Sequence, residues 1–443
     1  MKKITALALA LSMATGLVAC GGSSSNSTPT NQDSSGNSQS ESKGSADGAE
    51  VLEFYHGYYH AENEWPAAKV MRDIYEDFAN EHADGPVVFK PIAVENRDEI
   101  VSAQVAGGSF PDMVDMGSPL PQSAISQKLV LDLKPYIDEN NLKDAVGLNY
   151  TQNVVDGAIY TVHDQIETRG LWVNTDVLKE AGVAVEDLST WEGFASSMAK
   201  VTEKKNGNYG YAAGQGSLKM MYAYLASTEE GRALLDSEFD ETVIKSDVFA
   251  NAFKTIAKMD QVNGAEYTTP DVGNLMADFN QNGTAAVLSN GVWNASGIDE
   301  KLNDSIQPMV FPGNVSMATA GTGLTVSSGM SDEKTELALE FIKYMTSEEV
   351  QTKIFLGVQA NPCNTTLDLN ALATESGDPI VQKLAHACSL CNGAETVASD
   401  VSYKWGGDVG NAIINALMEC ANSSTDIDVR FEQLQKELIA LIG

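Results

Sequence analysis

The chain has 443 residues, of which 43% are hydrophobic and 20% charged, as in an ordinary globular protein of two or three domains. It carries 61 acidic and 28 basic residues, which gives a formal net charge of −33. Affinity for nucleic acid and for anionic lipid comes mostly from Lys and Arg. The charge balance therefore argues against nucleic acid as a partner and against electrostatic docking on a membrane. It does not exclude an anionic small ligand, because one pocket can differ in sign from the whole surface.

The first residues have the pattern of an export signal. Lys2 and Lys3 precede an apolar stretch over residues 4–18, which is too short and wrongly flanked for a transmembrane helix. The stretch ends in the sequence Leu-Val-Ala-Cys followed by two glycines, which resembles a bacterial lipobox. We therefore predict a lipoprotein signal peptide over residues 1–19 and a lipid anchor on the thiol of Cys20.

A low-complexity segment follows the predicted cleavage site. Residues 20–49 are mostly Gly, Ser, Asn, Thr, Gln, Asp and Ala, which bury too little apolar surface to offset the entropy of ordering. This composition predicts a disordered tether that holds a folded body at the extracytoplasmic face of the cell membrane. No later stretch reaches about 18 uninterrupted apolar residues, so we expect no further membrane span.

The four remaining cysteines, Cys363, Cys388, Cys391 and Cys420, lie close to the end of the chain. In an exported protein they could form two disulfides, with three connectivities. Free thiols and a zinc site are the alternatives, and the metal signal is weak because the single C-x-x-C has no second copy. A redox enzyme is disfavoured, because this C-x-x-C lies late in a helical stretch and not in a thioredoxin-like βαβ unit.

The body of the chain alternates strand and helix patterns. Residues 51–55 alternate apolar and other side chains as a strand does, and residues 65–81 carry apolar side chains at helical spacing. In chain order we predict strands at 51–55, 87–94, 113–116, 158–160, 170–174 and 285–288, and helices at 65–81, 96–106, 175–181, 189–205, 331–345, 408–421 and 431–441. The spacing of Ser189 and Glu192 is that of a capping box. Repeated alternation predicts an α/β fold with a mostly parallel sheet and helices on both faces.

Motifs of enzyme active sites are absent from the sequence. It contains no G-x-S-x-G, no H-E-x-x-H, no G-x-x-x-x-G-K-[ST] and no G-x-G-x-x-G. Carboxylate pairs are too frequent in so acidic a chain to argue for or against a glycosidase. We therefore expect no catalytic residue, no cofactor and no metal site.

Five stretches of the body carry recognisable patterns, namely Gly108–Val114 with G-x-x-P-D before a strand, Gly157–Tyr160 continued by Leu171–Gly182, Thr190–Glu192, Asn282–Trp293 and Ala338–Thr346. In order and spacing they resemble the family-1 extracellular solute-binding proteins of ATP-binding-cassette (ABC) sugar importers, the group that contains maltose-binding protein. The resemblance covers nearly all of residues 50–443. His163 departs from it, because the family usually has proline there.

The resemblance implies a two-lobe fold like that of periplasmic binding proteins of type II, with a ligand cleft between the lobes and three hinge crossovers. The crossovers are expected near residues 164–169, 322–328 and 363–370, the first lobe over 50–166 plus 325–365, and the second over 167–324 plus 366–443. A ligand that contacts both lobes stabilises the closed state. The implied function is capture of a sugar, expected to be an oligosaccharide, by a monomer that delivers it to the membrane permease of an importer.

Sugars present apolar C–H faces, which stack on aromatic rings, and hydroxyl groups, which bind carboxylates, amides and Arg. Trp293 and Trp405 match positions where the family places aromatic residues in the pocket, although each could instead pack in the core. The segment after the first strand adds His56, Tyr58 and Tyr59, because ligands gather at the carboxyl ends of strands in open α/β sheets.

Polar candidates come from three further places. Asp115 and Ser118 end the strand at 113–116, and Glu167 and Arg169 lie at the first crossover, where they could instead pair with each other. The resemblance implies that Glu167 is an acidic sugar ligand. Gln215 follows a small-residue strand and is a weaker candidate.

Three rival readings remain open at this stage. The same fold could bind another small solute, namely glycerol-phosphate, a polyamine or iron; a phosphate would need basic groups or helix N-termini, and Arg169 is the only obvious base. The chain could be a carbohydrate-active lipoprotein enzyme, which would need a cleft carboxylate pair with raised pKa values. It could also be a surface adhesin, which needs no closing cleft.

Overall fold

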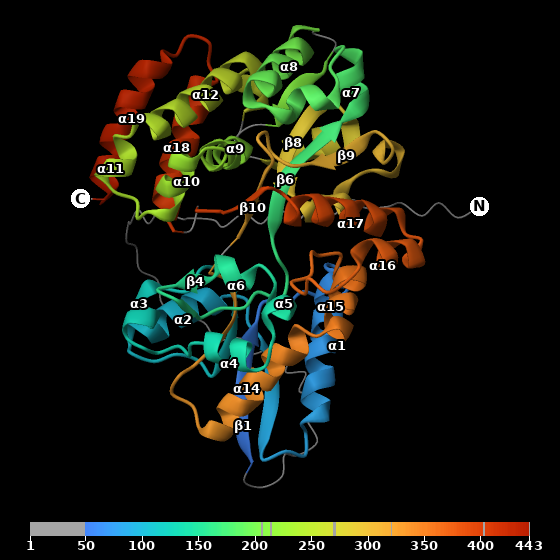
Figure 1. The fold of residues 1–443 in the computed structure, drawn as a ribbon, viewed down its shortest axis with the longest axis vertical. Coiled ribbons are helices and arrows are strands. Elements are labelled where there is room, and N and C mark those ends of the chain that lie inside the picture. Colours follow the sequence, from blue (N-terminus) through green and yellow to red (C-terminus); the bar gives the residue numbers. More distant parts are fainter. Residues whose placement is uncertain are drawn as a thin grey trace, which may run out of the picture.

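The computed structural model describes residues 49–442, apart from 205–206, 213–214, 269–271, 320 and 402–403. The predicted signal peptide, Cys20 and almost all of the predicted tether lie outside the described residues. The described chain forms two α/β lobes, one above the other in Figure 1, and each lobe has its own sheet and core. The predicted two-lobe α/β fold is confirmed.

The first lobe is built on a four-stranded sheet in the order β11-β3-β1-β2. β1 pairs in parallel with β2 and β3, while β11 is antiparallel to β3. Its strands are β1 (Glu50–His56), β2 (Val87–Ala93), β3 (Met113–Met116) and β11 (Gly323–Val326), with a separate hairpin of β4 (Val154–Val155) and β5 (Ala158–Ile159). Its helices are α1 (Pro66–Glu81), α2 (Arg97–Ala106), α3 (Gln122–Ser126), α4 (Lys134–Glu139), α5 (Lys143–Val146), α6 (Asn149–Gln152), α14 (Asp332–Met345) and α15 (Glu348–Lys353).

Aromatic rings fill the core of the first lobe. α1 buries Met71, Ile74 and Phe78 on one face, as the helical spacing in the sequence predicts. The rings of Phe89 and Phe341 lie with centroids 4.5 Å apart, so α14 packs on the sheet from far along the chain. The first lobe is therefore closed by residues before and after the second lobe in sequence.

The second lobe contains a six-stranded sheet in the order β12-β10-β6-β8-β7, with β9 also paired to β6. Its strands are β6 (Thr168–Asn174), β7 (Tyr209–Ala212), β8 (Ala285–Gly291), β9 (Ile306–Met309), β10 (Val315–Ala318) and β12 (Thr396–Ser399). Its helices are α7 (Thr175–Glu180), α8 (Trp191–Glu203), α9 (Gln215–Ala226), α10 (Glu229–Asp236), α11 (Glu241–Ile244), α12 (Asp247–Asn263), α13 (Val272–Ala277), α16 (Leu369–Ser376), α17 (Pro379–Asn392), α18 (Gly407–Cys420) and α19 (Ile427–Ile442).

Two local expectations were wrong in this lobe. The sheet is not mostly parallel, because its central strand β6 is antiparallel to β8, β9 and β10. The helix α8 is capped by Thr190, whose hydroxyl accepts the N–H of Gly193 at 3.1 Å, and not by Ser189. The carbonyl of Ser189 instead accepts the N–H of Gly313, which fixes this residue outside the helix.

Two of the connections between the lobes run side by side and antiparallel, and we call them the hinge ribbon (residues 162–169 beside 317–319 and 321–324). Val162 bridges Leu324 at the first-lobe end, and Thr168 pairs with Ala318 at the second-lobe end. The chain leaves one sheet after Ala318 and enters the other at Gly323, slightly before the crossing that we placed at 322–328.

A third connection joins the lobes after a π-helical turn, η6 (Ile354–Val358). The side-chain amide of Asn361 donates to the Thr168 hydroxyl at 3.0 Å and to the side-chain oxygen Oδ1 of Asn392 at 2.9 Å, which ties this connection to β6 and α17. Among the described residues, no helix is both long enough and apolar enough to cross a membrane.

Candidate functional site

A cluster of charged and aromatic side chains lies where the hinge ribbon enters the second lobe. Arg169 is the second residue of β6, and its guanidinium carbon lies 4.6 Å from the centroid of the Trp293 ring. Its Nε lies 3.8 Å from an Asp400 carboxylate oxygen, and its Nη2 lies 3.8 Å from a Glu167 carboxylate oxygen. Arg169 is thus surrounded by one aromatic face and two carboxylates, which fix its orientation.

The position of Trp293 depends on a glycine. Arg169 pairs with Gly291 across β6 and β8, and Trp293 follows in a 3-10 turn, η4 (Val292–Gly297). A Cβ on Gly291 would lie 2.1 Å from the Trp293 ring, so only glycine leaves room for it. The Gly291 carbonyl also accepts the indole N–H of Trp172 at 2.9 Å, which anchors this part of the strand.

Further along the same edge, Lys219 of α9 and Asp400 after β12 form an ion pair at 2.5 Å. Burial lowers the pKa of Lys219, and the Asp400 carboxylate counteracts that effect. Glu167 accepts a hydrogen bond from the Thr319 hydroxyl at 3.1 Å, across the hinge ribbon. The two cations Arg169 and Lys219 are therefore matched by two carboxylates.

On the first lobe, a second polar cluster occupies the carboxyl ends of β1 and β3. The guanidinium of Arg97 lies between two glycines: a Cβ on Gly57 would be 2.3 Å from its Nη1, and one on Gly117 would be 2.5 Å from its Nη2. Its Nε donates to the Asp115 carbonyl, and its Nη2 lies 4.0 Å from the Asp115 carboxylate. Burial raises the pKa of Asp115 to about 6, although Arg97 opposes the shift.

The predicted aromatic segment after β1 lies beside this cluster. His56 is 3% exposed, and its Nδ1 accepts the N–H of Tyr58, so the ring is neutral in this geometry. Burial, with Arg97 adding to it, lowers the pKa of His56 to about 4. Tyr58 packs on Trp65 with ring centroids 5.2 Å apart. Tyr59 is 42% exposed and stacks on His60 at 4.3 Å, which leaves it as the accessible aromatic group of this segment.

Three of the predicted ligand residues are not part of the contacts that form the two clusters. Trp405 is 4% exposed and packs against Tyr222 and Phe239 at 5.4 and 4.9 Å, so its position favours core packing over ligand contact. Ser118 is exposed after β3. Gln215 begins α9, and its side chain lies outside the description.

Four residues of these clusters were missed by the sequence analysis, namely Arg97, Gln165, Lys219 and Asp400. Gln165 donates to the Tyr58 hydroxyl at 2.7 Å and so links the hinge ribbon to the first lobe. Arg97 follows the predicted strand at 87–94, and this position was the only signal available for it. Nothing in the sequence brings Lys219 to Asp400, because 181 positions separate them.

The four described cysteines carry free, buried thiols, and burial raises the pKa of each. Of the alternatives that the sequence left open, the structure has the free-thiol one. Across the described part of the chain, no group of three His, Cys, Asp or Glu side chains is placed to hold a metal ion.

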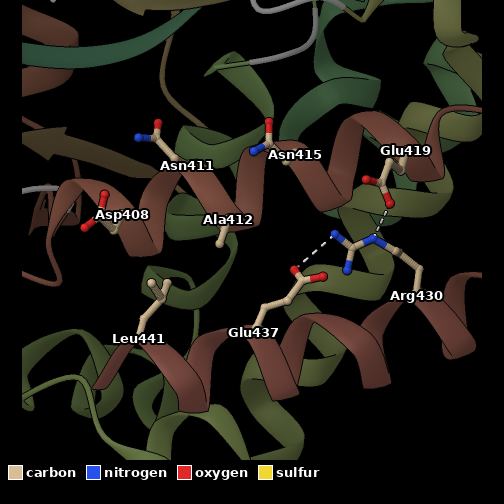
Figure 2. A pocket seen from close by; sticks show the side chains of 8 residues that line it. All are labelled: Asp408, Asn411, Ala412, Asn415, Glu419, Arg430, Glu437 and Leu441. Atoms are coloured by element: carbon tan, nitrogen blue, oxygen red, sulfur yellow. Dashed lines mark hydrogen bonds and ion pairs between the residues drawn. The ribbon is translucent and has the colours of Figure 1, made fainter. Parts of the chain in front are cut away.

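An open groove of about 540 Å³ lies between α18 and α19, outside both clusters. Figure 2 shows Arg430 at one end, paired with Glu419 and Glu437, and the amides of Asn411 and Asn415 along α18. No predicted ligand residue lines this groove, and the two ion pairs account for Arg430 as a link between the helices.

Comparison with known proteins places this architecture in a family. A sequence model described as bacterial extracellular solute-binding protein matches residues 73–381, more than half of the chain. The chain belongs to this family. No curated protein matches this solute-binding protein by sequence.

Solved structures agree with the assignment. A Streptococcus pneumoniae solute-binding protein, solved in complex with the blood group A-trisaccharide, is 43% identical, with 88% of this chain and 100% of that chain covered and a TM-score of 0.77. The sugar-binding protein MalE from Xanthomonas citri is 19% identical over 88% and 98% of the two chains, with a TM-score of 0.68. A chitin oligosaccharide binding protein is 20% identical over 88% and 98%, with a TM-score of 0.64. At these lower identities the likeness is one of fold.

Proposed function

We propose that this solute-binding protein captures an oligosaccharide between its lobes and delivers it to the membrane permease of an ABC importer. The cluster of Arg169 and Trp293 carries the proposal. One face of the indole ring is covered by the guanidinium, so the other face is held in a fixed orientation on which a sugar ring can stack. The nearby carboxylates of Glu167 and Asp400 are the acceptors that sugar hydroxyls need.

The charge balance of the site favours a neutral ligand. In the second-lobe cluster, Arg169 and Lys219 are matched by Glu167 and Asp400. A phosphate would need an excess of cationic donors, and a polyamine would need an excess of carboxylates. Iron would need a group of ligands, and the described residues contain no group of three His, Cys, Asp or Glu side chains placed to hold a metal ion. Hydroxyl-rich, uncharged ligands fit a mixed set of donors and acceptors.

The relative from Streptococcus pneumoniae supports the choice of ligand class. It was solved with the blood group A-trisaccharide, and at 43% identity over its full length it shares this fold throughout. We therefore take that trisaccharide as the first compound to test. Tyr59 and Arg97 on the first lobe are the groups expected to contact the ligand from the opposite side.

The N-terminal sequence supports an anchored receptor. A lipid on Cys20 and the tether over residues 20–49 would hold the protein on the extracytoplasmic face of the cell membrane, within reach of the permease. Mass spectrometry of the membrane fraction tests this point: a diacylated Cys20 at the N-terminus supports the anchor, and a chain cut elsewhere contradicts it. We expect the receptor to act as a monomer.

The ligand class is tested by titrating the purified protein and recording heat and intrinsic Trp fluorescence. The panel contains the A-trisaccharide, chitin oligosaccharides, raffinose, monosaccharides, glycerol phosphate, spermidine and ferric ion. Saturable binding of one oligosaccharide class, with no response to the charged compounds, is the expected result. A response to phosphate, polyamine or iron alone would overturn the proposal.

A further inference from the structure

The two strands of the hinge ribbon are paired with each other at both ends. Thr168 pairs with Ala318 at the second-lobe end, and Val162 exchanges backbone hydrogen bonds of 3.0 and 2.9 Å with Leu324 at the first-lobe end. Between these two pairs the antiparallel ladder is interrupted, because Gln165 bridges Pro362 and the N–H of Ile166 donates to the Asn361 carbonyl.

Beside the pair of Val162 and Leu324, the backbone of His163 lies against Gly323: a Cβ on Gly323 would lie 2.5 Å from the Cα of His163. Asp164 and Thr322 are the next residues on the two strands, so both lie close to this pair.

Both residues lie in the interior of the first lobe. The neighbouring pair of Val162 and Leu324 is fully buried in its core. Asp164 is 3% exposed and Thr322 is 2% exposed. Neither Oδ2 of Asp164 nor Oγ1 of Thr322 has a hydrogen-bond partner, although both atoms are buried.

The two unpartnered atoms are complementary. The Asp164 carboxylate oxygen accepts hydrogen bonds, and the Thr322 hydroxyl donates one. The other carboxylate oxygen of Asp164, Oδ1, lies 3.5 Å from Nε2 of Gln165 and 3.5 Å from Nδ1 of His163, so Oδ2 is the oxygen left for a new partner. A buried polar group without a partner is costly, and a conformation that joins these two groups is favoured by the bond it makes.

Both strands are bonded to the first lobe on either side of these two residues. The carbonyl of Asp164 accepts the Gln351 side-chain amide at 2.9 Å, and Gln351 is itself fully buried. Thr322 lies between Gly321 and Gly323, whose φ angles are +79° and +103°. Gly321 is held by the N–H of Leu120, which donates to its carbonyl at 2.9 Å, and by Oδ1 of Asn153, which accepts its N–H at 2.8 Å. The glycines on both sides let the backbone angles at Thr322 change locally.

We propose that Asp164 and Thr322 form a hinge latch, a hydrogen bond from the Thr322 hydroxyl to the free Asp164 carboxylate oxygen that is open in this arrangement of the lobes and forms when ligand closes them. The latch rests on the proposed function, because it needs a ligand that drives closure. It contributes to ligand affinity without touching the ligand, so Asp164 and Thr322 are positioning residues.

The test is a double-mutant cycle on affinity for the blood group A-trisaccharide. The latch predicts that Thr322→Val, which removes only the hydroxyl, weakens binding about tenfold in the wild-type background and less than about twofold in an Asp164→Ala background. Thr322→Ser keeps a hydroxyl and is expected to retain affinity. None of these changes should alter the affinity through ligand contact, so the coupling between the two positions is the decisive readout.

Tyr75→Phe is the matched control. The hydroxyl of Tyr75 is also buried in the first lobe without a partner, but it lies on α1 and not on the hinge ribbon. Its loss should leave trisaccharide affinity unchanged. If Tyr75→Phe weakens binding as Thr322→Val does, Tyr75 is the partner of Asp164 and the latch is wrong.

Crystal structures with and without the trisaccharide provide the second measurement, and they remain informative if Asp164→Ala does not fold. The latch predicts an Oγ1 to Oδ2 distance within hydrogen-bond range only in the complex. A direct or water-bridged bond between Thr322 and Asp164 already present without sugar overturns it, as does equal binding by wild type and Thr322→Val. Failure of the wild type to bind any sugar would instead overturn the proposed function.

Discussion

The guanidinium carbon of Arg169 lies 4.6 Å from the ring centroid of Trp293, on the strand that leads out of the hinge ribbon. This pair joins the lobe connection to the aromatic surface on which we expect sugar to stack. A ligand held there from the second lobe, and contacted from the first, stabilises the closed arrangement by the contacts that only closure provides.

Gly291→Ala is expected to lower ligand affinity without unfolding the protein. The added methyl group would lie 2.1 Å from the present position of the Trp293 ring, so the indole must move away from Arg169. We expect a loss of about tenfold or more in trisaccharide affinity by calorimetry. The matched control is Gly407→Ala at the start of α18, where a Cβ meets nothing within 4 Å. An unchanged affinity in Gly291→Ala would show that the ring position is not needed.

Trp405→Ala is expected to destabilise the fold. The Trp405 ring packs among Tyr222, Phe239 and Phe249, and only 4% of the residue's surface is exposed. Removal of the ring therefore leaves a large cavity. Loss of a buried Trp costs about 3–5 kcal/mol, and urea denaturation measures it. Trp405→Phe should recover most of the stability and keep full affinity. If Trp405→Phe stays stable but loses sugar binding, the ligand role implied by the family resemblance is correct after all.

Asp260 should make stability depend on pH. It is fully buried, Oδ1 accepts from Ser217 at 2.9 Å and from the Tyr211 hydroxyl, and burial raises its pKa from 3.8 to about 7. Between these two values the folded state binds the proton more tightly than the unfolded state does, so this group's contribution to stability falls as pH rises from about 4 to about 7.

The comparison with Asp260→Asn isolates that contribution. The free energy of unfolding of the wild type should fall relative to the variant across this pH window, by the order of a few kcal/mol in total. Urea denaturation at pH 4.5, 6 and 8 gives the three points that are needed. A constant difference between the two proteins over this range would show that the carboxyl group titrates normally.

The four buried cysteines should react as free thiols only after unfolding. In a Cys20→Ser variant, a chromogenic disulfide reagent should label almost none of them in the native state and all four in guanidinium, because burial raises their pKa and blocks access. Two labelled thiols or none in guanidinium would indicate one or two disulfides, the alternative that the sequence left open.

Local patterns in the sequence were sufficient for most of the fold. The strand at 113–116 and the helix beginning after Ser331 were placed as the structure has them, because each is set by its own apolar spacing and cap. The error at Ser189 arose because two neighbouring residues can both cap a helix, and a distant contact with Gly313 decides between them. The direction of β6 relative to its neighbours likewise depends on pairings between remote segments.

The candidate site was harder to predict from the sequence than the fold. Trp293 and Trp405 both follow strands and carry similar local patterns, and only the tertiary packing separates the half-buried ring from the core ring. Arg97 reaches Asp115 through space left by Gly57 and Gly117, a relation that no local spacing encodes. Glu167 and Arg169 were predicted as candidates because they lie within the crossover that the sequence resemblance places at 164–169.

The most direct test of the account is calorimetric titration of the blood group A-trisaccharide into the wild-type protein and the Trp293→Ala variant, with urea unfolding of both as the check on folding. The account predicts saturable binding with one site per chain, weakened at least about tenfold in Trp293→Ala while the stability changes little. Equal binding by the two proteins, or no binding of this or any other oligosaccharide by the wild type, would contradict it.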